Sequence, residues 1–159
     1  MNVKIKQITV VMIVLLVLVA VGCGADGPAE SDLDEMGMEM DAVPGDLDTS
    51  TTRMTEDERF HVTISSDLQA LTINEIHSWR VHVETPDGQS VNDAQLSIDG
   101  GMPQHNHGFP TVPEITQFLG EGDYLLEGVR FNMPGWWEMR FDIDANGQQD
   151  SVTFNIVLE

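Results

Sequence analysis

The chain has 159 residues, and 27 acidic against 7 lysine and arginine residues give it a formal net charge of −20. Such a negative chain repels the phosphate backbone, so nucleic acid is excluded as a partner. Cys23 is the only cysteine, which excludes an internal disulfide, a cysteine-rich zinc site and a cysteine nucleophile in the mature protein. The acidity fits either a saline habitat, where salt screens self-repulsion, or a cationic partner.

The first 22 residues have the pattern of an export signal. Lys4 and Lys6 precede an apolar run over residues 8–21, which is short for a membrane span of about 20 residues. The run ends in Ala20-Val21-Gly22-Cys23, which resembles the lipobox of bacterial lipoproteins, with alanine where leucine is usual. We predict a signal peptide over 1–22 and lipidation of Cys23, which anchors the chain to the extracytoplasmic face of a membrane. A retained signal anchor and ordinary cleavage nearby are the alternatives.

Residues 23–52 are small, acidic and dotted with proline, a composition that cannot bury enough apolar surface to fold. We predict a flexible tether. Within it, Met36, Met38 and Met40 alternate with glycine and glutamate. Thioethers suit Cu(I), so this stretch is either a metal-catching arm or part of an ordinary acidic linker, and the second interpretation is favoured.

From residue 53 onward, short runs of alternating apolar residues are separated by turn residues. This pattern predicts a single all-β domain over 53–159, a seven-stranded immunoglobulin-like β-sandwich. The seven predicted strands cover residues 60–64, 79–83, 96–98, 115–118, 124–131, 137–143 and 152–158.

The fifth of these strands has a break in its alternation. Tyr124, Leu126, Val129 and Phe131 all face inward only if a bulge near Gly128 shifts the parity. Tyr124 also matches the tyrosine corner of such sandwiches, which is a structural role.

Two loops carry unusual residues. The first contains Gly101-Met102-Pro103, then His105, His107 and Gly108, and the second reads Met133-Pro134-Gly135-Trp136. With Gly122-Asp123-Tyr124 opening a strand, these segments resemble the YtkA-like and FixH-like families of extracytoplasmic domains over roughly residues 71–158. The resemblance implies a small β-sandwich outside a membrane, in families linked with copper supply to respiratory oxidases. FixH-like members usually carry a transmembrane helix, which a lipid would replace here.

The same residues suggest a metal site without reference to any family. His105 and His107 lie two apart, so in extended backbone their imidazoles project to one side and can share one ion. Met102 and Met133 would add thioethers, and a mixed imidazole and thioether set favours copper over calcium or magnesium. His77 is a fifth candidate, although its parity equally suits a buried histidine. Each of these residues also has an ordinary interpretation as turn or core material.

A joint site depends on topology. If all seven runs are strands and successive strands reverse direction, the first, third and fifth connections lie at one end of the sandwich. These connections hold the approach to His77, the loop from Met102 to Gly108, and the Met133 loop. Without a strand at residues 115–118, the two methionine loops go to opposite ends.

Trp136 and Phe109 are candidates for contact with a partner protein, with edge packing the alternative for Trp136. His61 and His82 fall on polar strand faces and are expected to face solvent.

No catalytic motif is present, so we expect no enzyme. The favoured hypothesis is a lipid-anchored copper-binding or copper-delivery module of the cell envelope, whose tether reaches a copper acceptor. The alternative is a metal-free interaction or accessory module of an envelope or respiratory complex.

Overall fold

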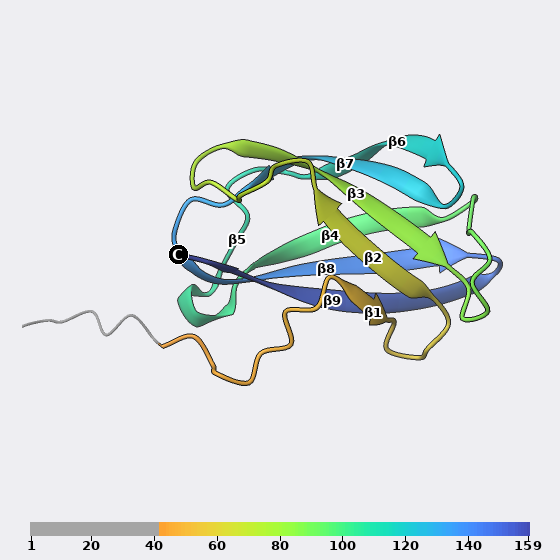
Figure 1. Ribbon diagram of the computed structural model, residues 1–159, viewed down its shortest axis with the longest axis horizontal. Helices are drawn as coiled ribbons and strands as arrows, with labels where there is room; N and C mark the ends of the chain where they lie inside the picture. The colour runs from red at the N-terminus through yellow and green to blue at the C-terminus, as the bar shows by residue number, and fades with distance from the viewer. Residues whose placement is uncertain (1–41) are drawn as a thin grey trace, which may run out of the picture. The chain divides into compact units, whose positions relative to one another are not determined.

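The computed structural model describes residues 42–159, which form two antiparallel sheets (Figure 1). One sheet has five strands in the order β1-β2-β3-β7-β6, and the other has four in the order β5-β4-β8-β9. The strands of the described chain are β1 (Thr52–Met54), β2 (His61–Ser66), β3 (Ile76–Glu84), β4 (Gln95–Met102), β5 (His107–Gly108), β6 (Glu114–Gly120), β7 (Asp123–Arg130), β8 (Gly135–Ala145) and β9 (Gln148–Leu158). A short 3-10 helix, η1 (Pro103–His105), separates β4 from β5.

The predicted all-β sandwich is confirmed, and each of the seven predicted strands is present as β2, β3, β4, β6, β7, β8 or β9. The count of seven was too low, because β1 and β5 also pair. They have three and two residues, too few for an alternating pattern to be visible in the sequence.

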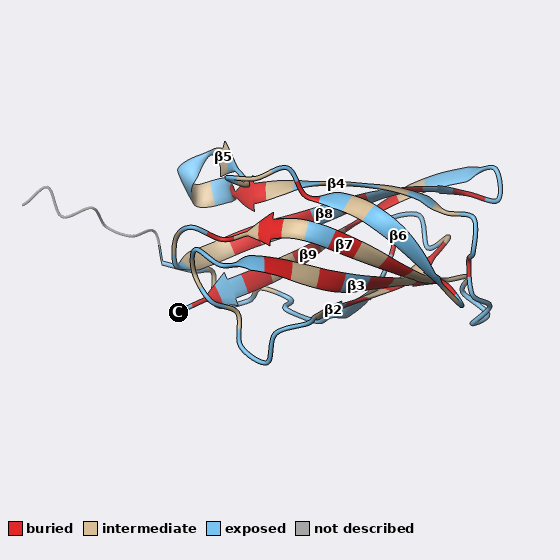
Figure 2. Cartoon of the chain, turned by 90° about the horizontal axis from the view of Figure 1, so that it is seen from above, coloured by how far each residue is buried: buried red, intermediate tan, exposed pale blue. Residues whose placement is uncertain are grey.

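The core lies between the inner faces of the two sheets, and its buried positions recur at every second residue (Figure 2). On β8, the side chains of Trp137, Met139 and Phe141 are fully buried. The intervening Glu138, Arg140 and Asp142 lie on the other face. Alternation of this kind is what a strand with one buried face requires.

The predicted bulge in β7 is confirmed. His77 of β3 pairs with Val129, whereas Trp79, two residues on, pairs with Leu126, so β7 contains one extra residue in this interval. Gly128 lies there with φ of +83°, a conformation that glycine adopts without strain. The bulge keeps both Leu126 and Val129 inside the core.

The tyrosine corner is also present. The buried Tyr124 hydroxyl donates a hydrogen bond to the Val91 carbonyl (2.8 Å) and accepts one from the Ala94 backbone N–H (2.9 Å). It therefore ties the connection between β3 and β4 to β7.

We predict that Tyr124→Phe lowers the free energy of unfolding by about 1–3 kcal/mol, because it leaves two backbone groups without their partner. Chemical denaturation measures the change. Thr116→Val is the control, because it removes a hydroxyl that bonds only to the exposed Glu127 and should cost less than about 0.5 kcal/mol. Equal losses in both variants would contradict this role of Tyr124.

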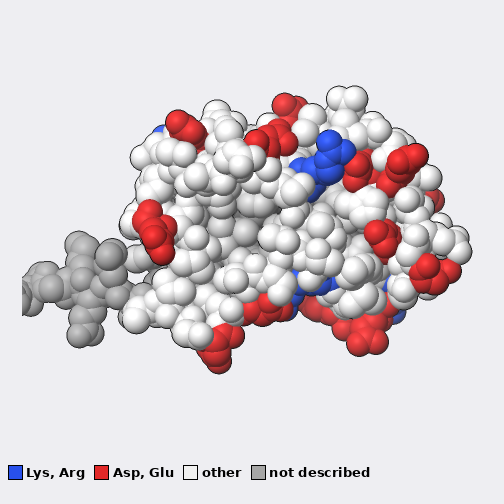
Figure 3. All heavy atoms as spheres, in the orientation of Figure 1, with Lys and Arg blue, Asp and Glu red and all other residues white. Residues whose placement is uncertain are grey.

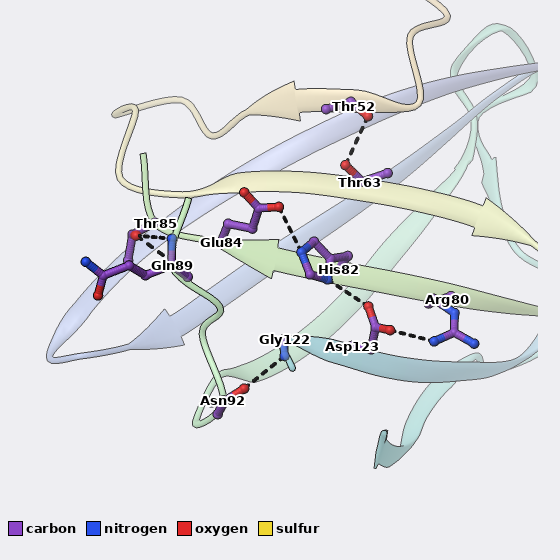
Figure 4. Close-up of polar contacts among 10 residues, drawn as sticks. All are labelled: Thr52, Thr63, Arg80, His82, Glu84, Thr85, Gln89, Asn92, Gly122 and Asp123. Carbon is purple, nitrogen blue, oxygen red and sulfur yellow. Dashed lines mark hydrogen bonds and ion pairs between the residues drawn. The ribbon is translucent and has the colours of Figure 1, made fainter. Parts of the chain in front are cut away.

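On the outer face of the five-stranded sheet, His82 is held between two carboxylates (Figure 4). Its Nδ1 lies 2.7 Å from Asp123 Oδ1 and its Nε2 lies 2.9 Å from Glu84 Oε1. Burial raises the pKa of Asp123, but the hydrogen bonds and charges of Arg80 and His82 outweigh it, so the pKa lies below its usual value. His82 and His61 both lie on the outer face of this sheet, as expected from the sequence, although each is half-buried rather than fully exposed.

Asp150 fastens the loop between β1 and β2 to β9. Its carboxylate accepts backbone hydrogen bonds from Asp57, Arg59 and Ser151. Burial raises the pKa of Asp150, but these bonds and one from the Thr55 hydroxyl outweigh burial and lower the pKa below its usual value.

A lowered pKa predicts a defined pH dependence for Asp150. Its stabilisation is fully present above the pKa of the unfolded chain, about 3.9, and is lost as pH falls through the lower folded pKa. We expect Asp150→Asn to cost about 1 kcal/mol at pH 7. The difference from the parent protein should shrink below about pH 4. Urea denaturation across pH measures it, and a difference that grows as pH falls would contradict the assignment.

Residues 42–51, which precede β1, lie against the sandwich. The Ala42 carbonyl accepts a hydrogen bond from Gln104 (3.2 Å), and the Asp48 carbonyl accepts one from Asn155 (2.8 Å). The Asp48 carboxylate also pairs with Arg53 (3.4 Å). These contacts give this part of the predicted tether a fixed path along the domain.

Acidic side chains are spread over the surface, whereas basic ones are few (Figure 3). Each of the five described arginines has a polar partner: Arg53 pairs with Asp48, Arg59 with Asp57, Arg80 with Asp123, Arg130 with Asn74 and Arg140 with Asp142. In residues 42–159, no helix is long and apolar enough to cross a membrane.

Candidate functional site at one end of the sandwich

Three connections meet at one end of the sandwich, as the topological argument required. The condition was a strand at residues 115–118, and β6 fulfils it. The connections are residues 67–75, 103–113 and 131–134. The Asn74 N–H donates to the Phe131 carbonyl (2.7 Å), and this bond joins the connection at residues 67–75 to the one at residues 131–134. A Cβ placed on Gly135 would lie 3.0 Å from the Met102 Cε, so the two methionine loops also meet.

Aromatic rings link the connections. Phe131 contacts Trp137 edge-on, with ring centroids 5.3 Å apart, and Phe109 stacks on Trp137 at 5.8 Å. Two histidines lie at opposite ends of this aromatic cluster: His77 contacts Phe131 (5.6 Å), and His107 contacts Trp137 (5.6 Å). The cluster therefore fixes the position of the histidine loop against the core.

His105 and His107 lie side by side, with ring centroids 6.0 Å apart and planes at 23°. With metal–nitrogen bonds of about 2.0 Å, two imidazoles that share an ion place their centroids about 5–6 Å apart, so the centroid spacing of this pair is compatible with a shared ion. His107 Nδ1 donates to its neighbour's carbonyl, Gly108 O (3.0 Å). That bond assigns the proton to Nδ1 and leaves Nε2 free to bind a metal, the usual arrangement of metal-ligating histidines.

The two methionines are less accessible. Met102 is 1 % exposed and belongs to the core, and Met133 is half-buried and packs against it. The Met133 carbonyl also accepts the Trp137 indole hydrogen bond (3.1 Å). Both residues lie at the predicted end of the fold, but their thioethers are engaged in apolar packing.

His77 is fully buried, and its Nε2 donates to the Thr72 carbonyl (2.8 Å). Its Nδ1 has no hydrogen-bond partner among the described residues. The His77 ring contacts Phe131, Phe131 contacts Trp137, and Trp137 contacts His107, so two aromatic rings separate the two histidines. His77 is therefore a buried histidine, which was its alternative interpretation from the sequence.

Neither predicted partner-contact residue projects freely. Trp136 is half-buried, and its indole N–H donates to Asn155 on the neighbouring strand β9 (2.9 Å). Phe109 does not form a free loop apex, because its ring stacks on Trp137. The edge packing considered for Trp136 from the sequence agrees with this geometry.

Glycines allow the histidine loop to approach the sheet. A Cβ on Gly101 would lie 2.1 Å from the His107 carbonyl oxygen, and a Cβ on Gly100 would lie 2.1 Å from the Glu138 carbonyl oxygen. Both distances are far below any real contact. Gly101 is therefore required for β5 to pair with β4, and Gly100 is required for the close approach of β4 to β8.

We predict that Gly101→Ala separates β5 from β4 and destabilises the domain by about 1–3 kcal/mol. Faster amide hydrogen exchange at His107 and Gly108 would report the separation, together with loss of the close approach of the two imidazoles in NMR. Gly45→Ala is the control, because nothing lies within 4 Å of its new Cβ. Unchanged exchange at His107 would contradict this reading of Gly101.

Two depressions flank the histidines. A pocket of about 340 Å³ is lined by residues of β4, η1, β5 and β8, including Asp99, His107 and Glu138. A second, about 440 Å³ and mainly apolar, includes His105, Pro134 and Leu158 in its wall, together with Ala42 and Val43. Within residues 42–159, no group of three or more His, Cys, Asp or Glu side chains is arranged to hold a metal ion.

Cys23, the predicted lipidation site, lies outside the described residues, as do Met36, Met38 and Met40.

Comparison with known proteins identifies the family. The YtkA-like family model matches residues 54–142, which is more than half of the chain. The chain belongs to the YtkA-like family. The match contains the histidine loop and the Met133 loop of this YtkA-like domain. No curated protein matches the sequence.

Among solved structures, the chain is similar to a DUF4426 family protein from Pseudomonas aeruginosa PAO1. That likeness has 14% identity, covers 69% of this chain and 97% of the other, and has a TM-score of 0.48. The ZirS C-terminal domain is similar with 13% identity over 87% of this chain and 86% of the other, at a TM-score of 0.38.

Proposed function

We propose that this YtkA-like domain is an extracytoplasmic, lipid-anchored copper-binding module that carries or delivers copper in the cell envelope. His105 and His107 are the proposed ligands. The observation that supports the role best is their adjacency at one end of the sandwich, with His107 Nε2 left free by the hydrogen bond from Nδ1. Imidazole nitrogens are good copper ligands, and thioethers favour Cu(I) among the oxidation states.

The charge of the surroundings supports cation binding. Met102 and Met133 lie at the same end, but each would have to leave its packing to reach the histidines. The carboxylates of Asp99 and Glu138 share the pocket of His107 and favour a bound cation. The proposed partners are the membrane, through the lipid on Cys23, and a copper acceptor of the respiratory chain or envelope.

A metal-free interaction module is less well supported. Its predicted contacts were Trp136 and Phe109, and both side chains are engaged within the domain.

We expect the full chain with Cys23→Ser, held in detergent, to bind one Cu(I) per chain. The substitution removes the thiolate that Cys23 would carry in any chain that is not lipidated. His105→Ala/His107→Ala should weaken binding at least tenfold, because removing even a residue that only supports a ligand typically costs 10–100-fold. Anaerobic competition with a Cu(I) chelator measures it.

His61→Ala in β2 is the matched control, since it removes an imidazole that is not at this end of the domain, and it should bind as the parent does. Circular dichroism confirms that each variant is folded. Parental affinity in the double variant, or no Cu(I) binding by the folded parent, would refute the proposed role.

A further inference from the structure

One long edge strand of the sandwich is open. Within residues 42–159, β6 pairs with β7 on one side and with no strand on the other. Figure 2 shows this strand as exposed along most of its length. The unpaired N–H and C=O groups of such an edge are a template for pairing with another strand. An edge of this kind is therefore a candidate interaction surface.

The other edges of the two sheets are better protected. β1 and β5 have only three and two residues, and such short edge strands offer little to pair with. The chain around β1 covers the free side of β9, since the Glu56 N–H donates to the Ser151 carbonyl (2.8 Å) and Asn155 donates to the Asp48 carbonyl (2.8 Å). The start of β4 is open, but its exposed side chains are polar: Gln95, Ser97 and Asp99.

β6 has little of this protection. It contains no lysine or proline, and its one charged residue, Glu114, is at its first position. Phe118 and Leu119 are 45 % and 39 % exposed, although the Phe118 ring packs against Tyr124 with ring centroids 5.1 Å apart. Two bulges, at which Thr116 and Leu119 have no partner on β7, twist the strand but do not cover it. β6 is thus an apolar and nearly neutral edge on a strongly acidic chain.

We propose that β6 is the surface through which two copies of this chain pair, strand against strand, about a two-fold axis. An axis through Gln117, the central residue, gives the one antiparallel register that pairs all seven residues. This register pairs Glu114 with Gly120, Ile115 with Leu119, and Thr116 with Phe118. No like charges face each other across the axis, and apolar side chains of the two copies meet. The inference is independent of the copper role.

Charge favours a second copy over a cationic partner. Two chains of net charge −20 repel each other, so they approach best where charge is least, and β6 has a single carboxylate. A cationic protein would instead be drawn to carboxylate-rich faces, such as the depression of about 640 Å³ whose wall includes Glu56, Asp142 and Asp144. Pairing through β6 must therefore strengthen as salt screens the repulsion, whereas docking of a cationic partner weakens.

Cross-linking across the two-fold axis tests the proposal. In the full chain with Cys23→Ser, held in detergent, Gln117→Cys supplies one thiol that lies opposite its own copy. Opposite Cα atoms of paired strands are about 4.5–5.5 Å apart, a distance that a disulfide spans. We expect the oxidant diamide to convert this variant to covalent dimer about tenfold faster than Ser65→Cys. Ser65 is also exposed but lies on the inner strand β2 of the same sheet.

A second substitution identifies the edge. Leu119→Lys, added to the Gln117→Cys variant, places a charge in the paired edge and should slow cross-linking about tenfold, although it reduces the net negative charge. Met54→Lys is the matched control, because it changes an exposed apolar residue on the other edge strand, β1, and should leave the rate unchanged. Raising the salt from about 0.02 M to about 0.5 M should speed cross-linking several-fold.

The outcomes are distinct once circular dichroism shows that each variant is folded. If Gln117→Cys cross-links no faster than Ser65→Cys, the proposal is overturned and the edge is free for an extended segment of a different protein. Rates that fall with salt, or that survive Leu119→Lys, also contradict pairing through β6. Fast cross-linking that increases with salt and is lost in Leu119→Lys but not in Met54→Lys supports it.

Discussion

The contact between Phe131 and Trp137 is the interaction on which the proposed site depends. It lies where the Met133 connection enters β8, and Phe109 and His107 pack on the same indole ring. A loop of eleven residues between β4 and β6 would otherwise have few apolar contacts to order it. The fully buried Trp137 therefore fixes the position of the half-buried His107 against the core.

Much of the fold could be predicted because one face of each long strand is buried. Alternation located seven strands, and broken parity around Gly128 located the bulge. The same count of strands correctly placed three connections at one end. The sequence did not show β1 or β5, since two or three residues carry no period. The pairing of β5 also depends on the close approach that Gly101 allows.

The site was only partly predictable for a different reason. Spacing brings His105 and His107 together, but it cannot show whether a nearby methionine points to them or into the core. Met102 is buried, although its loop position suggested a ligand. The hydrogen bond from Gln104 to the Ala42 carbonyl, which fixes the chain before β1 beside His105, has no sequence signature either.

The most direct test of the account is a long-range ¹H–¹⁵N NMR spectrum of the histidine side chains during anaerobic addition of Cu(I). The five histidines of the chain all lie in the described region, so each can serve as a probe. The account predicts that the Nε2 resonance of His107 and a ring nitrogen of His105 shift at one equivalent, while those of His61, His77 and His82 do not. Shifts confined to the other three histidines, or none at one equivalent, would contradict it.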